Sequence, residues 1–206
     1  MSLAEKLSEG LIELGLSLSE SQQQALLDYI ALLQKWNKVY NLTAVREPEN
    51  MLYQHLLDSL AVLPYVGAGR LLDVGTGGGL PGIVLAIARP ELDITLLDSN
   101  QKKTTFLRQA CIQLGLKNVK VECLRVDNYQ PTPLFDMVIS RAFSDLTEFV
   151  RLSARLCRDG GVLLAMKGVY PYDELAQLPH EFDQHEIIAL NVPGLEAQRN
   201  LVILRV

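Results

Sequence analysis

The chain has 206 residues, of which 49% are hydrophobic and 21% charged, with 19 basic against 24 acidic side chains. This composition is typical of one globular domain with a small appendage, and it excludes disordered, collagen-like and coiled-coil chains. The net charge of −5 argues against a protein that binds nucleic acid through overall positive charge alone, although a local basic patch remains compatible with it.

The cysteines, the first residues and the apolar runs indicate the compartment. Cys111, Cys123 and Cys157 are odd in number and share no metal-binding spacing, which favours reduced thiols. The first residues lack the basic and apolar regions of a signal peptide, and no uncharged apolar run reaches the ~18 residues of a membrane span. We therefore expect a soluble cytoplasmic protein, with no metal and no membrane partner.

Residues 1–66 are predicted to form a helical cap. Ser19 and Gln22 match a capping box, the serine-to-glutamine spacing that begins many helices. Apolar residues then recur at helical spacing, at Leu26, Tyr29, Ile30, Leu33 and Trp36. A turn is expected at 37–41, and a second helix over 48–63, opened by proline.

Strands and helices are predicted to alternate over residues 67–206, which we assign to the main domain. Strands are expected at 71–74, 93–98, 119–124, 135–140 and 161–167, with helices at 83–88, 99–114 and 145–157. Two final strands, at 186–192 and 201–206, are separated only by a loop. Alternation predicts a doubly wound parallel sheet, and the loop-joined pair predicts an antiparallel edge. The expected fold class is α/β, with a seven-stranded, mostly parallel, Rossmann-like sheet.

A glycine-rich loop, Asp-Val-Gly-Thr-Gly-Gly-Gly-Leu-Pro-Gly at 73–82, joins the first strand to the following helix. Glycines let the backbone approach a ligand closely, and such sheets bind ligands outside the carboxyl ends of their strands. Asp98, at the end of the second strand, could accept hydrogen bonds from ribose hydroxyls. The loop therefore predicts a nucleotide-like ligand, the alternative being a turn that only packs strand against helix.

The spacing of the loop favours one ligand class. Residues 77–82 fit the dinucleotide fingerprint G-x-G-x-x-G. When the fingerprint is started at Gly75, the first glycine after the strand, the position of its third glycine is occupied by Leu80. The pattern, with Asp73 before Gly75, resembles motif I of class I S-adenosylmethionine-dependent methyltransferases, whose seven-stranded sheet also ends in an antiparallel pair. No Walker A lysine follows the loop, which disfavours a P-loop nucleotidase, and a nicotinamide-dependent dehydrogenase is the third alternative.

Several segments together resemble one family. They are Trp-Asn-Lys-Val-Tyr-Asn-Leu-Thr at 36–43, His-Leu-Leu-Asp-Ser at 55–59, the glycine loop, Ser-Arg-Ala-Phe at 140–143 and Lys-Gly at 167–168. Their combination is similar to the ribosomal RNA small subunit methyltransferase G (glucose-inhibited division protein B) family, over about residues 5–206. The resemblance implies methyl transfer from S-adenosylmethionine to N7 of guanine 527 in 16S ribosomal RNA, within the 30S subunit or a precursor.

The resemblance also implies site residues. The cofactor-binding set is Gly75, Leu80, Val126, Asp127 and Arg141, to which we add Asp98 and Asp73 from their positions. Asp127 is expected to accept from the adenine amine, and Asp73 to hold the loop or a water near the amino-acid end of the cofactor. Guanine N7 carries a lone pair and no proton at neutral pH, so transfer requires alignment rather than a general base. We expect no catalytic acid or base, and Arg141 is the one catalytic candidate.

The sequence predicts the RNA-binding surface in less detail than the cofactor site. Basic candidates near the strand carboxyl ends and adjoining loops are Arg46, Arg125, Arg141, Lys167 and Arg199. Phe143 and Tyr170 could stack on a flipped-out guanine, with burial an equal alternative for Phe143. His55 and Asp58 are expected to orient the N-terminal helices against the sheet, and Trp36 to pack against it.

Two other functions remain open at this point. A methyltransferase of the same fold could act on a small molecule or a protein, because fold does not determine substrate. The chain could also be a non-catalytic, RNA-binding ribosome assembly factor. A monomer is favoured in each case.

Overall fold

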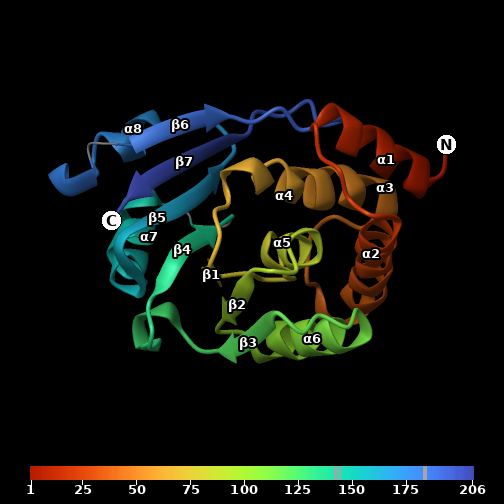
Figure 1. The fold of residues 1–206 in the computed structure, drawn as a ribbon, viewed down its shortest axis with the longest axis horizontal. Coiled ribbons are helices and arrows are strands. Elements are labelled where there is room, and N and C mark those ends of the chain that lie inside the picture. The colour runs from red at the N-terminus through yellow and green to blue at the C-terminus, as the bar shows by residue number, and fades with distance from the viewer. Residues whose placement is uncertain (142, 144, 183–184) are drawn as a thin grey trace.

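The structure is a computed structural model that describes residues 1–141, 143, 145–182 and 185–206. These residues form a seven-stranded sheet with helices on both faces, in the order β3-β2-β1-β4-β5-β7-β6 (Figure 1). The strands are β1 Arg70–Val74, β2 Asp93–Asp98, β3 Val119–Cys123, β4 Phe135–Ser140, β5 Cys157–Lys167, β6 His185–Ala189 and β7 Asn200–Arg205. The first five pair in parallel and β7 runs antiparallel to both of its neighbours, which confirms the predicted sheet.

The sheet separates two apolar cores, because successive strand residues point to opposite faces. Leu71 and Ile139 belong to the core under α5 (Gly82–Ala88) and α6 (Gln101–Gln113). Leu72 and Val138 belong to the core under α7 (Leu146–Ser153). Figure 1 shows α5 and α6 on one side of the sheet and α7 on the other. Burial on both faces explains the nearly continuous apolar strands.

The N-terminal segment is helical, as predicted, and packs on the same side as α5 (Figure 1). It contains α1 Leu3–Glu13, α2 Glu20–Tyr40, α3 Pro48–Met51, the π-helical turn η1 Leu52–Leu57, α4 Asp58–Leu60 and the 3-10 turn η2 Leu63–Tyr65. The capping box predicted at the start of α2 is present, since Ser19 Oγ accepts from Gln22 N and Gln22 Oε1 accepts from Ser19 N. The apolar side chains of the N-terminal helices belong to the same continuous core as one face of the sheet. The division of the chain between residues 66 and 67 stays a prediction.

The turn predicted at 37–41 was wrong, because α2 continues through Tyr40 and ends at Asn41, where φ is 49°. Asn37 lies within the last turns of the helix and is buried. Its amide donates to Thr43 O and accepts from Thr43 N, each at 2.9 Å. The side chain therefore caps the loop that follows instead of ending the helix.

Other predicted bounds also differ from the structure. The helix expected over 145–157 ends at Ser153 and is followed by a 3-10 turn. The single helix expected over 48–63 is divided by the π-helical turn, a feature that is frequently found at functional sites. Strand β5 begins earlier than expected, at Cys157, which already pairs with Phe135 of β4 before the register between the two strands shifts. Strand β6 ends at Ala189, which pairs with Asn200, the first residue of β7.

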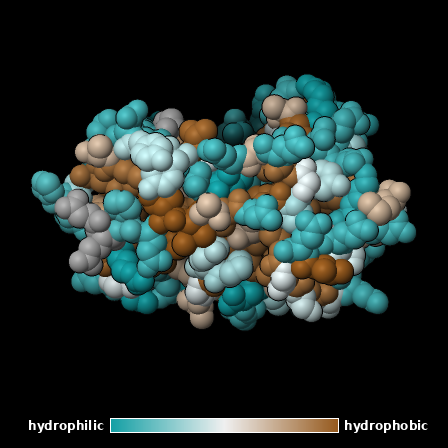
Figure 2. Space-filling view, turned by 90° about the horizontal axis from the view of Figure 1, so that it is seen from above, coloured by the Kyte–Doolittle hydropathy of each residue, from teal (hydrophilic) through white to brown (hydrophobic). Residues whose placement is uncertain are grey.

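Short helical turns complete the described fold: η3 Val126–Asn128, η4 Ala154–Leu156, α8 Tyr172–Leu175 and η5 His180–Phe182. Figure 2 views the molecule from above, with polar residues over most of the rim and apolar residues gathered towards the middle. In the part of the chain that the structure describes, no helix is long and apolar enough to cross a membrane.

Candidate active site

The glycine loop follows β1 and leaves open space at its first glycine. Gly75 has φ +68°, and a Cβ built there would have no atom within 4 Å. Gly79, with φ +97°, instead packs against Ile83 of α5, where a Cβ would overlap the side chain. The loop therefore needs glycine for two reasons: an open face at Gly75 and close helix packing at Gly79.

Asp73, in β1, holds the two ends of this loop together. Its Oδ2 accepts from Thr76 Oγ1 at 2.6 Å and from Gly82 N at 2.8 Å. Complete burial raises the pKa of the carboxyl group to about 6, although both hydrogen bonds act in the opposite direction. Oδ1 is buried and has no hydrogen-bond partner among the described residues. The contacts agree with the predicted loop-holding role.

Asp98 connects the end of β2 to the same loop. Its Oδ2 accepts from Gly77 N at 2.9 Å, and its Oδ1 accepts from Asn100 N at 2.8 Å. Asn100 in turn caps α6, accepting from the Lys102 and Lys103 amides. Because a carboxylate offers about four acceptor positions, Asp98 keeps capacity for further donors.

A first pocket, of about 380 Å³, lies at the ends of β1, β2 and β3. Its volume falls within the ~300–1,000 Å³ of small-ligand sites. Four residues predicted to bind the cofactor, Gly75, Asp98, Val126 and Asp127, line it together, and Phe143 is a further wall. Phe143 also packs against Phe149 of α7, with ring centroids 5.4 Å apart.

The acidic side chain at the rim of this pocket is kept ionised by a neighbour. Arg125 donates to Asp127, with Nη2 3.0 Å from Oδ2, and this hydrogen bond lowers the pKa of the carboxyl group. Asp127 is thus an acceptor at neutral pH. The remaining predicted residues do not line the first pocket: Leu80 and Asp73 are buried behind the loop.

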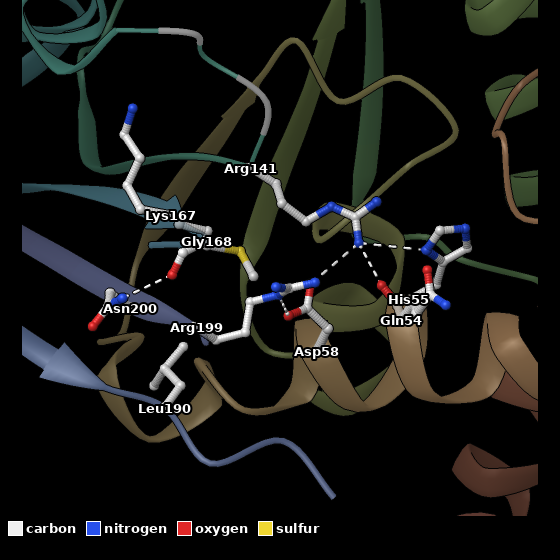
Figure 3. A pocket seen from close by; sticks show the side chains of 10 residues that line it. Gln54, His55, Asp58, Arg141, Lys167, Gly168, Leu190, Arg199 and Asn200 are labelled. Carbon is white, nitrogen blue, oxygen red and sulfur yellow. Dashed lines mark hydrogen bonds and ion pairs between the residues drawn. The ribbon is translucent and has the colours of Figure 1, made fainter. Parts of the chain in front are cut away.

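Arg141, predicted with the cofactor residues, lies in a second pocket of about 350 Å³ (Figure 3). Its Nη1 donates to Gln54 O at 3.0 Å and to Asp58 Oδ2 at 3.3 Å. Arg199, just before β7, donates from Nε to the other oxygen of Asp58 at 2.8 Å. Ala142, within the motif that drew attention to Arg141, lies outside the described residues.

His55 completes this network as a neutral side chain. Burial, and then the charge of Arg141, lower the pKa of its imidazole to about 4. Its Nδ1 stands 3.5 Å from Arg141 Nη1, so Nδ1 is the acceptor. The proton then sits on Nε2, which is 2.9 Å from Thr43 Oγ1. His55 and Asp58 thus join the N-terminal helices to the loops of the sheet, as expected.

Of the other RNA candidates, Lys167 lines the second pocket but points away from the two guanidinium groups (Figure 3). Its ammonium donates to Glu174 at 2.6 Å. Tyr170 packs against Tyr172 in a tilted arrangement, with ring centroids 4.2 Å apart, and Tyr172 is 73% exposed. Arg46 and Arg125 lie outside this pocket.

Two further observations concern the packing of Trp36 and the side chains that could bind a metal ion. Trp36 packs against Phe106 of α6, with ring centroids 5.7 Å apart, which confirms its predicted contact with the main domain. Among the residues that the structure describes, no group of three or more His, Cys, Asp or Glu side chains is placed to hold a metal ion.

Comparison with known proteins identifies the family. Residues 22–202 match the family model GidB, described as rRNA small subunit methyltransferase G. The chain belongs to this family. A relative from Laribacter hongkongensis, named ribosomal RNA small subunit methyltransferase G, is 58% identical over 204 residues, which cover 99% of each chain. A family member of the same name from Neisseria gonorrhoeae is 52% identical over 205 residues, again covering 99% of each chain.

Comparison of this chain with solved structures identifies its fold. A SAM-dependent methyltransferase from Aquifex aeolicus matches with a TM-score of 0.58 at 18% identity, over 84% of this chain and 97% of that one. TrmN from Thermus thermophilus matches with a TM-score of 0.56 at 20% identity, over 72% of this chain and 48% of that one. The fold is that of class I S-adenosylmethionine-dependent methyltransferases.

Proposed function

We propose that this protein transfers a methyl group from S-adenosylmethionine to N7 of guanine 527 in 16S ribosomal RNA. The observation that carries the proposal is membership of the small subunit methyltransferase G family along residues 22–202. The substrate is the RNA within the 30S subunit or a precursor. The protein acts as a monomer in the cytoplasm.

The first pocket fits S-adenosylmethionine. The empty space at Gly75 lets the donor lie against the backbone, and Asp98 keeps acceptor capacity for the ribose hydroxyls. Val126 and Asp127 line the same pocket, where Val126 would pack against the adenine and Asp127 would accept from its exocyclic amine. Leu80 and Asp73 act from behind, by maintaining the shape of the loop.

When bound, S-adenosylmethionine supplies an electrophilic methyl group on a sulfonium sulfur. The acceptor, guanine N7, has an available lone pair and loses no proton, so the chain needs to supply no general base. Its contribution is to hold N7 in line with the methyl group and to exclude other orientations, which can account for a large rate gain. Phe143, at the wall of the first pocket, is placed to limit where the guanine can lie.

The test uses labelled S-adenosylmethionine with unmodified small subunits, and with deproteinised RNA from the same subunits in parallel. N7 methylation is located by reduction and aniline scission. We expect cleavage at guanine 527 only, and none with the Gly75→Asp variant, whose side chain enters the donor pocket. Label in a protein or metabolite fraction would refute the RNA substrate, and donor binding without any transfer would favour an assembly factor.

A further inference from the structure

The turn η3, which carries Val126 and Asp127 in the wall of the first pocket, is held only weakly by its own backbone. It is a single 3-10 turn, and none of its residues is buried. Asn128 N donates to Arg125 O at 3.1 Å, and Tyr129 N donates to Val126 O at 3.2 Å. Both distances exceed the usual N–H···O length of about 2.9–3.0 Å, and 3-10 hydrogen bonds have poorer geometry than α-helical ones. An exposed turn of this kind opens easily unless other parts of the chain hold it.

Two contacts with the main domain hold this turn in place. At its end, the buried ring of Tyr129 packs against Phe135 of β4, with ring centroids 6.4 Å apart. The second contact is made by Arg155, whose Nη1 donates to Tyr129 O at 2.9 Å and whose Nη2 donates to Val126 O. One guanidinium group thus joins the carbonyl oxygens at both ends of the turn. The planar fork of arginine suits this bridging contact better than the compact ammonium of lysine does.

The backbone that carries Arg155 is itself well fixed. Arg155 lies in η4, between α7 and β5, and Ser153 before it and Leu156 after it are both fully buried. Two residues further on, Cys157 pairs with Phe135, the residue against which Tyr129 packs. The two contacts that hold η3 therefore share one base in the core of the main domain. A side chain with so fixed an origin can restrict the turn instead of moving with it.

We propose that Arg155 is a positioning residue that sets the selectivity of the first pocket for adenine, by holding η3 so that the Asp127 carboxylate meets the exocyclic amine. This inference rests on the proposed function and adds a specificity determinant to it. Arg155 acts through the turn, because Val126 and Asp127 line the pocket and Arg155 does not. An ionised carboxylate only accepts hydrogen bonds, so a fixed Asp127 favours a 6-amino purine over a 6-oxo purine, which presents an acceptor at the same place.

The experiment compares binding of S-adenosylhomocysteine and S-inosylhomocysteine by the full chain in calorimetric titrations. In the second ligand a carbonyl oxygen replaces the 6-amino group of adenine, so the native chain should prefer the first. Arg155→Gln should weaken binding of S-adenosylhomocysteine by about three- to tenfold, as loss of one net hydrogen bond does, and leave binding of S-inosylhomocysteine nearly unchanged. In the methylation assay, the KM for S-adenosylmethionine should rise by the same factor at native kcat, because Arg155 touches no reacting atom.

Arg151→Gln is the matched control, because it removes the same charge from the same segment. The pKa of Asp127 is lowered mainly by the hydrogen bond from Arg125, and the charge of Arg151 adds to this effect. Arg151 pairs with the exposed Glu148 at 3.7 Å. Arg151→Gln should therefore keep the native preference between the two ligands. An equal loss of preference in both variants would show that charge sets the selectivity, and would overturn the positioning role.

The outcomes separate this inference from the proposed function. If the native chain does not methylate the small subunit, the proposed function fails, while the two titrations still test the role of Arg155. If it does methylate, and Arg155→Gln keeps the native preference or weakens both ligands equally, the positioning role is wrong. Arg155→Lys serves if the first variant does not fold. It should retain only part of the preference, because an ammonium group suits one carbonyl better than two, and full native preference would overturn the proposal.

Discussion

Gly75 and Gly115 allow backbone strain to be separated from ligand contact. Their φ angles are +68° and +65°, and a Cβ at either position would have no atom within 4 Å. Replacing either glycine by alanine should therefore lower the free energy of unfolding by the same amount, about 1–2 kcal/mol, because an L-residue is strained in the left-handed region. For a chain of this size we expect each variant to lose roughly 2–8 °C in melting temperature.

Only one of the two substitutions should affect the donor. Gly75 lines the first pocket, whereas Gly115 follows α6 and lines a cavity at the opposite edge of the sheet. The methyl group of Gly75→Ala takes ligand space, so we expect affinity for S-adenosylmethionine to fall by about tenfold or more, equivalent to ~1.4 kcal/mol. Calorimetric titration and thermal unfolding of both variants measure the two effects. Native affinity in Gly75→Ala, with the same melting loss as Gly115→Ala, would refute the placement of the donor against this glycine.

Three further variants test other parts of the site. In the folded state the pKa of His55 is about 4, below its ordinary value of 6.5. Between these two pH values the folded state binds fewer protons than the unfolded state, so native stability falls as the pH drops from about 6.5 to about 4. His55→Gln, compared with the native chain by urea unfolding at about pH 7 and pH 4.5, should therefore regain about 2–3 kcal/mol of relative stability at the lower pH, and a constant difference would contradict a neutral His55. Tyr29→Phe removes the 2.7 Å hydrogen bond to Gly78 O, and should cost about 1–3 kcal/mol in unfolding and weaken donor binding; unchanged stability would show that the bond is dispensable. Tyr172→Ala removes the exposed ring that packs against Tyr170, the residue predicted to stack on the guanine; it should leave melting and donor binding as they are but weaken subunit binding by about fivefold or more, and native binding would exclude stacking by this pair.

The features predicted correctly from the sequence are those with local causes. The strand before Gly75 is a short apolar run buried on both faces, and the glycines that follow mark a loop whatever the rest of the chain does. The end of α2 was not predictable in this way. Asparagine usually favours turns, but Asn37 finds partners for its amide in Thr43, six residues further on, and the helix continues past it.

The second pocket depends on contacts between distant parts of the chain. Asp58 pairs with Arg141 and Arg199, which are 83 and 141 residues away in sequence. A local pattern could suggest that His55 and Asp58 touch the sheet, but it could not place both arginines on one carboxylate. Arg141 is likewise held in the second pocket by its hydrogen bonds to Gln54 and Asp58 of the N-terminal helices, which only the assembled fold shows.

The N-terminal helices are part of the site as well as of the core. The carboxyl edge of a parallel sheet is made of loops, whose polar groups lack the regular partners of the strands. Here those partners come from the helices: Tyr29 of α2 donates to Gly78 in the glycine loop, and a Cβ at Gly78 would stand 3.2 Å from Leu33. Asp58 of α4 holds Arg141 and Arg199. One helical segment thus contacts both the loop proposed for the donor and the two arginines of the second pocket, so a substitution in the cap can alter methyl transfer without touching either substrate.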